Sequence, residues 1–188
     1  MMTDEVAAMN IAYWADLDSP LRRLPVPRSE DDKFVTIRTT WLNDASRLDA
    51  PLLQQLYDFW RGARNGAAMP PVSAIDPFSL RFALGNLVVM EPIAGGLDFR
   101  VRLFGSRVAS RLGYDLTGRL LSSISNDVAR HYTEQAVAKV LHGEQPMLLQ
   151  RHRRLVDKGP VDYTCLLLPF GDGTPSRIVY GVHFADED

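Results

Sequence analysis

The sequence has little cysteine, no long apolar run and almost no net charge. Its single cysteine, Cys165, excludes an internal disulfide and any zinc site that needs several cysteines. No apolar run is long enough to span a bilayer, and the mean hydropathy is -0.12. With 21 basic and 23 acidic residues, the net charge of -2 argues against a general nucleic-acid binder. We therefore expect a protein that binds neither nucleic acid nor membrane.

The motifs of the common enzyme classes are also missing. The chain has no P-loop, no dinucleotide-binding glycine fingerprint, no nucleophile elbow and no zinc-protease helix. The flanks of Cys165 predict a buried strand, in which a thiol behaves as a small hydrophobe. The acidic N-terminus lacks the basic and then apolar regions of a signal peptide. We expect a non-enzymatic, cytoplasmic protein.

What the chain does contain is enough apolar sequence for a core. Of its 188 residues 46% are hydrophobic and 23% are charged, as in ordinary globular proteins. Residues 1–33 differ, because they hold seven acidic residues against four basic ones and no apolar periodicity. We predict an acidic arm over residues 1–50, partly disordered or extended, and one domain over residues 51–188. Within the arm, weak alternation over residues 34–41 is compatible with a short strand.

Three segments of the domain have helical periodicity or capping signals. Residues 52–65 predict a leading amphipathic helix whose apolar stripe is Leu53, Leu56, Tyr57 and Trp60. Asp76 followed by a proline predicts a short helix that ends near Gly85. Asn126 can cap a longer helix to about His142, whose predicted apolar face is Val128, Tyr132, Val137, Val140 and Leu141.

Strand patterns stand at both ends of this domain. Residues 87–92 and 99–104 flank a glycine turn and predict a hairpin. Three further strands are predicted over residues 147–156, 161–168 and 177–184. Strands grouped at the ends with helices between them predict an α+β fold, in which helices cover one face of a five-stranded antiparallel sheet.

Two segments of the sequence resemble PAS domains. GYDLTGR at residues 113–119 resembles the glycine-tyrosine segment that follows the second PAS strand, and LHGEQP at residues 141–146 resembles the end of the long PAS helix. The chain is also similar to a family of short, stand-alone bacterial PAS proteins long catalogued as a domain of unknown function. That similarity runs over residues 52–185 and rests on Trp60, Arg64, Gly66, Pro70, Asp76 and the run FRVRLFGS from Phe99.

The resemblance implies a sensory or regulatory module. PAS domains bind small molecules between sheet and helices, or bind proteins through the outer face of the sheet. Many dimerise through a leading helix, which implies a homodimer formed by Leu53, Leu56, Tyr57 and Trp60. The length leaves no room for an output domain, so we expect a separate signalling protein as partner. The alternatives are a ligand-free interaction scaffold, a haem sensor and a small enzyme.

Alternation along the strands selects the side chains that an internal ligand would touch. Apolar pockets and filled cores share this pattern, so the sequence leaves both open. The candidates for contact with a small apolar ligand are Val101, Leu103, Ile124, Val137, Cys165, Leu167, Tyr180 and Val182.

Two groups of basic residues belong to the strands. Arg100 and Arg102 flank Val101, so we expect them on the outer sheet face, where they would contact a protein partner or the acidic arm. Arg151, Arg153, Arg154 and Lys158 predict a solvated strand face. The alternative for both groups is an anionic ligand or partner, because the planar guanidinium suits carboxylate and phosphate.

We predict no cofactor. Haem-binding PAS domains use a histidine on the long helix, and His131, at the edge of the apolar stripe, is the candidate here. A boundary residue on the helix surface is the simpler interpretation. PAS-like light sensors that use flavin carry their cysteine in an asparagine-rich helical motif, whereas Cys165 lies in a predicted strand.

Overall fold

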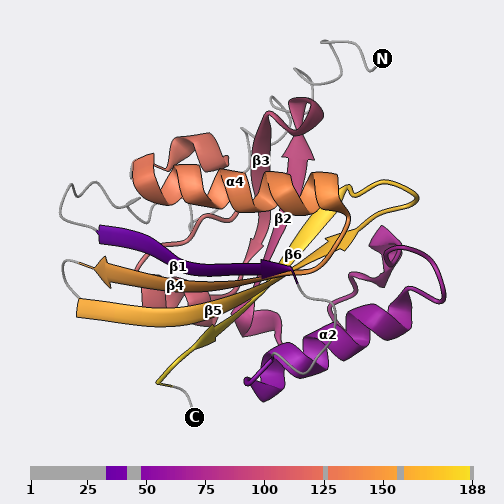
Figure 1. Cartoon of the computed structure of the whole chain (residues 1–188), viewed down its shortest axis with the longest axis horizontal. Coiled ribbons are helices and arrows are strands. Elements are labelled where there is room, and N and C mark those ends of the chain that lie inside the picture. Colours follow the sequence, from indigo (N-terminus) through magenta and orange to yellow (C-terminus); the bar gives the residue numbers. More distant parts are fainter. Residues whose placement is uncertain (1–32, 42–47, 125–126, 156–158, 187–188) are drawn as a thin grey trace.

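The computed structural model describes residues 33–41, 48–124, 127–155 and 159–186 (Figure 1). Its centre is one antiparallel sheet with the strand order β1-β4-β5-β6-β2-β3. The strands are β1 Lys33–Trp41, β2 Leu87–Ile93, β3 Asp98–Phe104, β4 Met147–Leu155, β5 Gly159–Phe170 and β6 Arg177–Phe184. The α-helices are α2 Pro51–Ala63, α3 Ser106–Leu112 and α4 Asp127–Gly143, and the short 3-10 helices are η3 Val72–Ala74, η4 Leu84–Asn86, η5 Ala94–Gly96 and η6 Leu121–Ser123.

The predicted α+β fold is confirmed, with two additions. The five predicted strands are β2 to β6, and α4 lies across one face of the sheet (Figure 1). The first addition is β1, which lies within the predicted arm and pairs with β4 as a sixth strand. The second is the position of α2, the predicted leading helix, which lies on the opposite face of the sheet from α4 (Figure 1). The remainder of the predicted arm, apart from residues 48–50, lies outside the described residues.

Both faces of the sheet are apolar because both are covered. Tyr163, Cys165 and Val182 belong to the core beneath α3 and α4. Leu166 and Val179, one residue out of phase, belong to a second core beneath α2. A strand covered on both faces needs no polar alternation, which explains the unbroken burial at the end of β5.

The apolar stripe of α2 packs on the chain's own sheet. Leu53, Leu56, Tyr57 and Trp60 are all buried there, and the Trp60 indole Nε1 donates a hydrogen bond of 2.7 Å to the Pro169 carbonyl. Our expectation that these side chains form a dimer surface therefore differs from the structure. The physical reason is that the outer face of the sheet is itself apolar and the stripe buries it.

The helix predicted from Asp76 and the predicted apolar face of α4 both differ from the structure. Asp76 Oδ2 accepts hydrogen bonds of 2.9 Å from the Ser79 amide and hydroxyl, as a cap would, but turns and η4 follow instead of an α-helix. One capping interaction does not offset the cost of helix nucleation in so short a segment. In α4 the predicted phase was partly wrong, because Val128 and Tyr132 are 49% and 40% exposed. Its buried residues are Ala129, Ala136, Val137 and Val140. Asn126 lies outside the described residues.

Candidate functional site

A cavity of about 60 Å³ lies in the core between the sheet and α3, η6 and α4. Most of its lining is apolar and comes from strands and helical segments alike. Four predicted ligand contacts, Ile124, Cys165, Tyr180 and Val182, line it. Val101, Val137 and Leu167 belong to the same core without lining the cavity. The cavity therefore occupies the place that the resemblance implied.

The predicted ligand contact Leu103 was wrong. It packs against the second core, on the outer side of the sheet. Val89 pairs with Leu103 whereas its neighbour Met90 pairs with Val101, so β3 has one extra residue at this point. A bulge of this kind reverses the alternation, and sequence periodicity cannot show it.

Arg100 also differs from its prediction. It is only 4% exposed, so it does not form the exposed partner contact that we expected. Arg102 is partly exposed and lies 3.7 Å from Glu91 in an ion pair, and Glu91 is also paired with Arg177 at 2.8 Å. Arg102 and Leu103 line a wider, open groove of about 770 Å³ beside residues 72–85, on the α2 side of the sheet.

Two arginines line the cavity that were not predicted there. Arg151 and Arg153 were predicted on a solvated face, but they line the cavity and are 5% and 2% exposed. Arg153 donates a hydrogen bond to the Tyr114 hydroxyl and lies over its ring. Arg151 lies 3.4 Å from both the Thr133 hydroxyl and the Tyr132 carbonyl oxygen. Their i, i+2 spacing from buried Leu149 was the signal for a shared inward face.

The other titratable groups beside Arg151 are neutral near pH 7. Burial raises the pKa of the Cys165 thiol to about 11, although Arg151 opposes this shift. Burial likewise raises the pKa of the Tyr163 and Tyr180 hydroxyls above their usual range, again against the effect of Arg151. Among the described residues that line the cavity, the charged groups are the guanidiniums of Arg151 and Arg153. The Tyr180 hydroxyl is buried and has no hydrogen-bond partner in the described structure.

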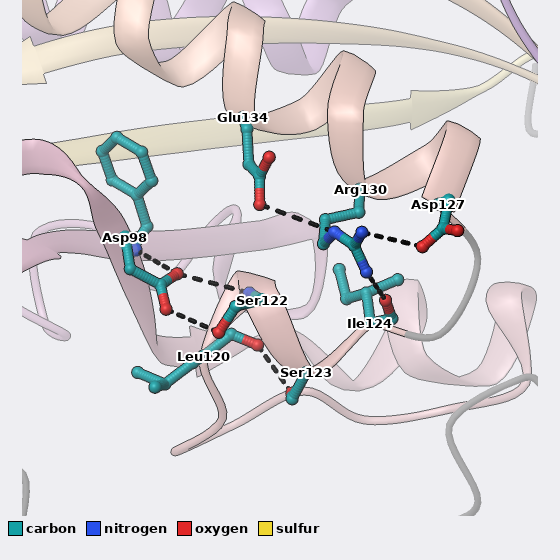
Figure 2. A network of polar contacts seen from close by, with 9 residues as sticks. Asp98, Leu120, Ser122, Ser123, Ile124, Asp127, Arg130 and Glu134 are labelled. Carbon is teal, nitrogen blue, oxygen red and sulfur yellow. Dashed lines mark hydrogen bonds and ion pairs between the residues drawn. The ribbon is translucent and has the colours of Figure 1, made fainter.

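A cover segment, residues 120–124, lines the cavity through Leu121 and Ile124 and is held by a network of polar contacts (Figure 2). Asp98 accepts hydrogen bonds from the Ser122 hydroxyl at 2.6 Å and from the Ser122 amide at 3.3 Å. Arg130 of α4 donates to the Ile124 carbonyl at 3.0 Å and pairs with Asp127 at 2.7 Å. These contacts fix the side of the cavity that contains Ile124, while the sheet fixes the other side.

The haem candidate His131 does not reach the cavity. It is exposed on α4, and its Nε2 lies 2.9 Å from the Gln135 side-chain nitrogen. Over the described ranges, no three His, Cys, Asp or Glu side chains gather as a metal site would require. In the same ranges, no helix combines the length and apolar character needed to cross a membrane.

This architecture is an α+β domain with a small cavity between its antiparallel sheet and its helices. The family model described as PAS domain matches residues 48–182, and the chain belongs to this family of sensory and signalling modules.

A solved structure of an RNA-binding Light-Oxygen-Voltage receptor is similar, with 17% identity and a TM-score of 0.40. The match covers 95% of this chain and 47% of that chain, so this chain spans about half of the receptor's length. No curated protein matches the chain.

Proposed function

We propose that this protein is a non-enzymatic, cytoplasmic sensory module that binds a small molecule in the cavity and signals to a separate protein. The observation that carries the proposal is the cavity itself. Strand residues Cys165 and Tyr180 line one side and cover-segment residue Ile124 lines another, so one ligand would contact both. A ligand that binds one arrangement of the cover segment better than another shifts its population.

The proposed output surface is the groove on the α2 side of the sheet. Its lining combines apolar side chains such as Leu103 and Leu80 with Arg102 and Arg177. Apolar area beside charged residues is typical of a protein-binding patch. The module would act as a homodimer or with another protein through surfaces of this kind, because the α2 stripe is already buried within the chain.

Native mass spectrometry of the purified chain tests the proposal. We expect a mass in excess of the polypeptide under native conditions and its loss on denaturation. Ala129 lines the cavity from α4, so Ala129→Met should fill the space and abolish the excess. Ala138, less buried on the same helix, provides the matched control Ala138→Met, which should retain the excess. If native and denatured masses agree, and no small molecule stabilises the chain, the ligand-free scaffold is the better description.

A further inference from the structure

We infer that a second copy of the chain occupies the groove beside residues 72–85, with Phe78 of each copy inserted into the groove of the other. This inference rests on the proposed function and names the partner at its output surface. The first observation is that the groove and an exposed aromatic side chain belong to one segment. Phe78 is 74% exposed, and Pro77 and Leu80 on either side of it line the groove. A patch that carries both a hollow and a side chain to fill it can meet its own copy about a two-fold axis.

The second observation is that the turn around Phe78 is held by its own contacts. Arg81 donates a hydrogen bond of 3.0 Å from its guanidinium to the Phe78 carbonyl, and Asp76 accepts the two hydrogen bonds from Ser79 described above. The Arg81 guanidinium carbon also lies 4.7 Å from the centre of the Phe78 ring. An exposed aromatic side chain that is already held in place loses little conformational freedom on binding, so it is well suited to anchor an interface.

The third observation is the size and character of the groove. A closed apolar cavity of about 150 Å³ admits a benzene ring. The groove, of about 770 Å³, therefore has space for the Phe78 ring and for the residues beside it. Apolar side chains that include Ile75, Leu84 and Leu103 line it, and contact with them would remove the ring from water.

The fourth observation is that the patch carries charges of both signs. Asp76, Arg102 and Arg177 line the groove, and Glu91 forms ion pairs with both arginines. A patch with charges of one sign would repel its own copy, whereas a patch with both signs is compatible with itself. The same balance gives no preference for a strongly acidic occupant such as residues 1–33 of the chain. The charges therefore favour a second copy over the acidic arm.

Sedimentation velocity of the full chain over a range of concentrations tests the inference. We expect a reversible equilibrium between monomer and dimer. Phe78→Ala removes the anchor and should raise the dimer dissociation constant by about thirtyfold or more, as the loss of a dominant interface contact does. The fold should be retained, because the ring is exposed. The matched control is Leu97→Ala, which removes an 88% exposed side chain that does not line the groove and should leave the dissociation constant unchanged.

A second variant fills the groove instead of removing the anchor. Ser106 is exposed and lines the groove, so Ser106→Trp should obstruct it and weaken the dimer to a similar extent. A mixture of the Phe78→Ala and Ser106→Trp chains keeps one complete contact, between the intact Phe78 of one chain and the open groove of the other. The mixed dimer should therefore be tighter than the dimer of either variant alone.

The outcomes separate this inference from the proposed function. A full chain that is monomeric at every concentration, or a dimer that survives both Phe78→Ala and Ser106→Trp, would overturn the inference. A mixture that associates no better than either variant alone would refute the reciprocal insertion. If the chain is monomeric but native mass spectrometry finds a bound small molecule, the inference fails and the sensory proposal stands. A dimer that depends on Phe78 without any bound small molecule would have the opposite meaning.

Discussion

The close contact between α2 and β6 predicts the effect of one added methyl group. A Cβ at Gly181 would lie 2.4 Å from Leu56 Cδ2 and 3.0 Å from Leu53 Cδ2. Carbon atoms in contact are normally about 3.5–4.0 Å apart, so Gly181→Ala must displace the Leu56 side chain by roughly 1 Å. Leu53 and Leu56 are both fully buried and have little space to move into.

The expected change in the free energy of unfolding of Gly181→Ala is the sum of two opposing effects. Overpacking a buried contact destabilises the folded chain by about 1–3 kcal/mol. Replacing glycine by alanine also lowers the conformational entropy of the unfolded chain, which stabilises the folded state by about 0.4–1 kcal/mol. We therefore expect Gly181→Ala to lower the free energy of unfolding by about 1–2 kcal/mol. For a chain of this size, each kcal/mol corresponds to a fall in Tm of about 2–4 °C.

Urea unfolding followed by tryptophan fluorescence measures this change, because Trp60 lies in the affected interface. The matched control is Gly62→Ala, on the exposed side of α2 with no atom within 4 Å of the added Cβ. It should stabilise the helix by up to about 1 kcal/mol. In the double variant Gly181→Ala with Leu56→Ala, the clash is relieved, so the loss should be smaller than the sum of the single losses.

An unchanged free energy of unfolding in Gly181→Ala would show that α2 does not pack on β6 in solution. A second result would also refute the reasoning. If Gly181→Ala separated a dimer into stable monomers without lowering the free energy of unfolding, the stripe of α2 would contact a second copy of the chain rather than its own sheet.

Three further predictions concern the two cores of the domain and the cover segment. Because folding raises the pKa of Cys165 from 9.0 to about 11, the thiol's contribution to stability should be complete below pH 9 and lost as the pH rises towards 11. Urea midpoints at about pH 8 and about pH 10.5, with Cys165→Ala as the control, measure this, and equal wild-type midpoints would contradict it. Ser122→Ala removes the side-chain bond to Asp98 and should cost about 0.5–1.5 kcal/mol and speed amide exchange in the cover segment; unchanged exchange would count against that contact. Trp60→Phe leaves the Pro169 carbonyl without its donor and should cost about 1–3 kcal/mol by urea unfolding, whereas full stability would show that the bond is not formed.

The sequence was sufficient for the order and type of most elements. Periodicity identifies a strand or helix because it reports which side of the segment is buried, and this succeeded for β2 to β6 and for α2. It does not report what covers that side, so the partner of the α2 stripe could be identified only from the structure. The inward face of α4 was partly mispredicted because two of its four buried residues are alanines, whose hydrophobic signal is weaker than that of exposed Val128 and Tyr132.

The candidate site was less predictable than the fold. Three cavity-lining residues, Cys165, Tyr180 and Val182, were predicted because alternation holds along β5 and β6, while the bulge in β3 moved Leu103 to the other face. Arg151 and Arg153 were missed because charged residues on a strand are usually solvated. Their burial depends on a cavity formed by distant segments, which no local pattern encodes.

The position of β1 at the edge of the sheet decides where a usable fragment must begin. β1 pairs with β4 from Lys33 opposite Arg154 to Trp41 opposite Met147. A fragment cut to residues 48–182 would leave the backbone donors and acceptors of that edge unpaired, and an open edge recruits strands from other molecules. The edge belongs to the strand that carries Arg151 and Arg153 on its inward face. An extended peptide that displaced β1 would therefore enter the sheet beside the strand that carries the two arginines of the cavity, and strand exchange there would act directly on the proposed ligand site.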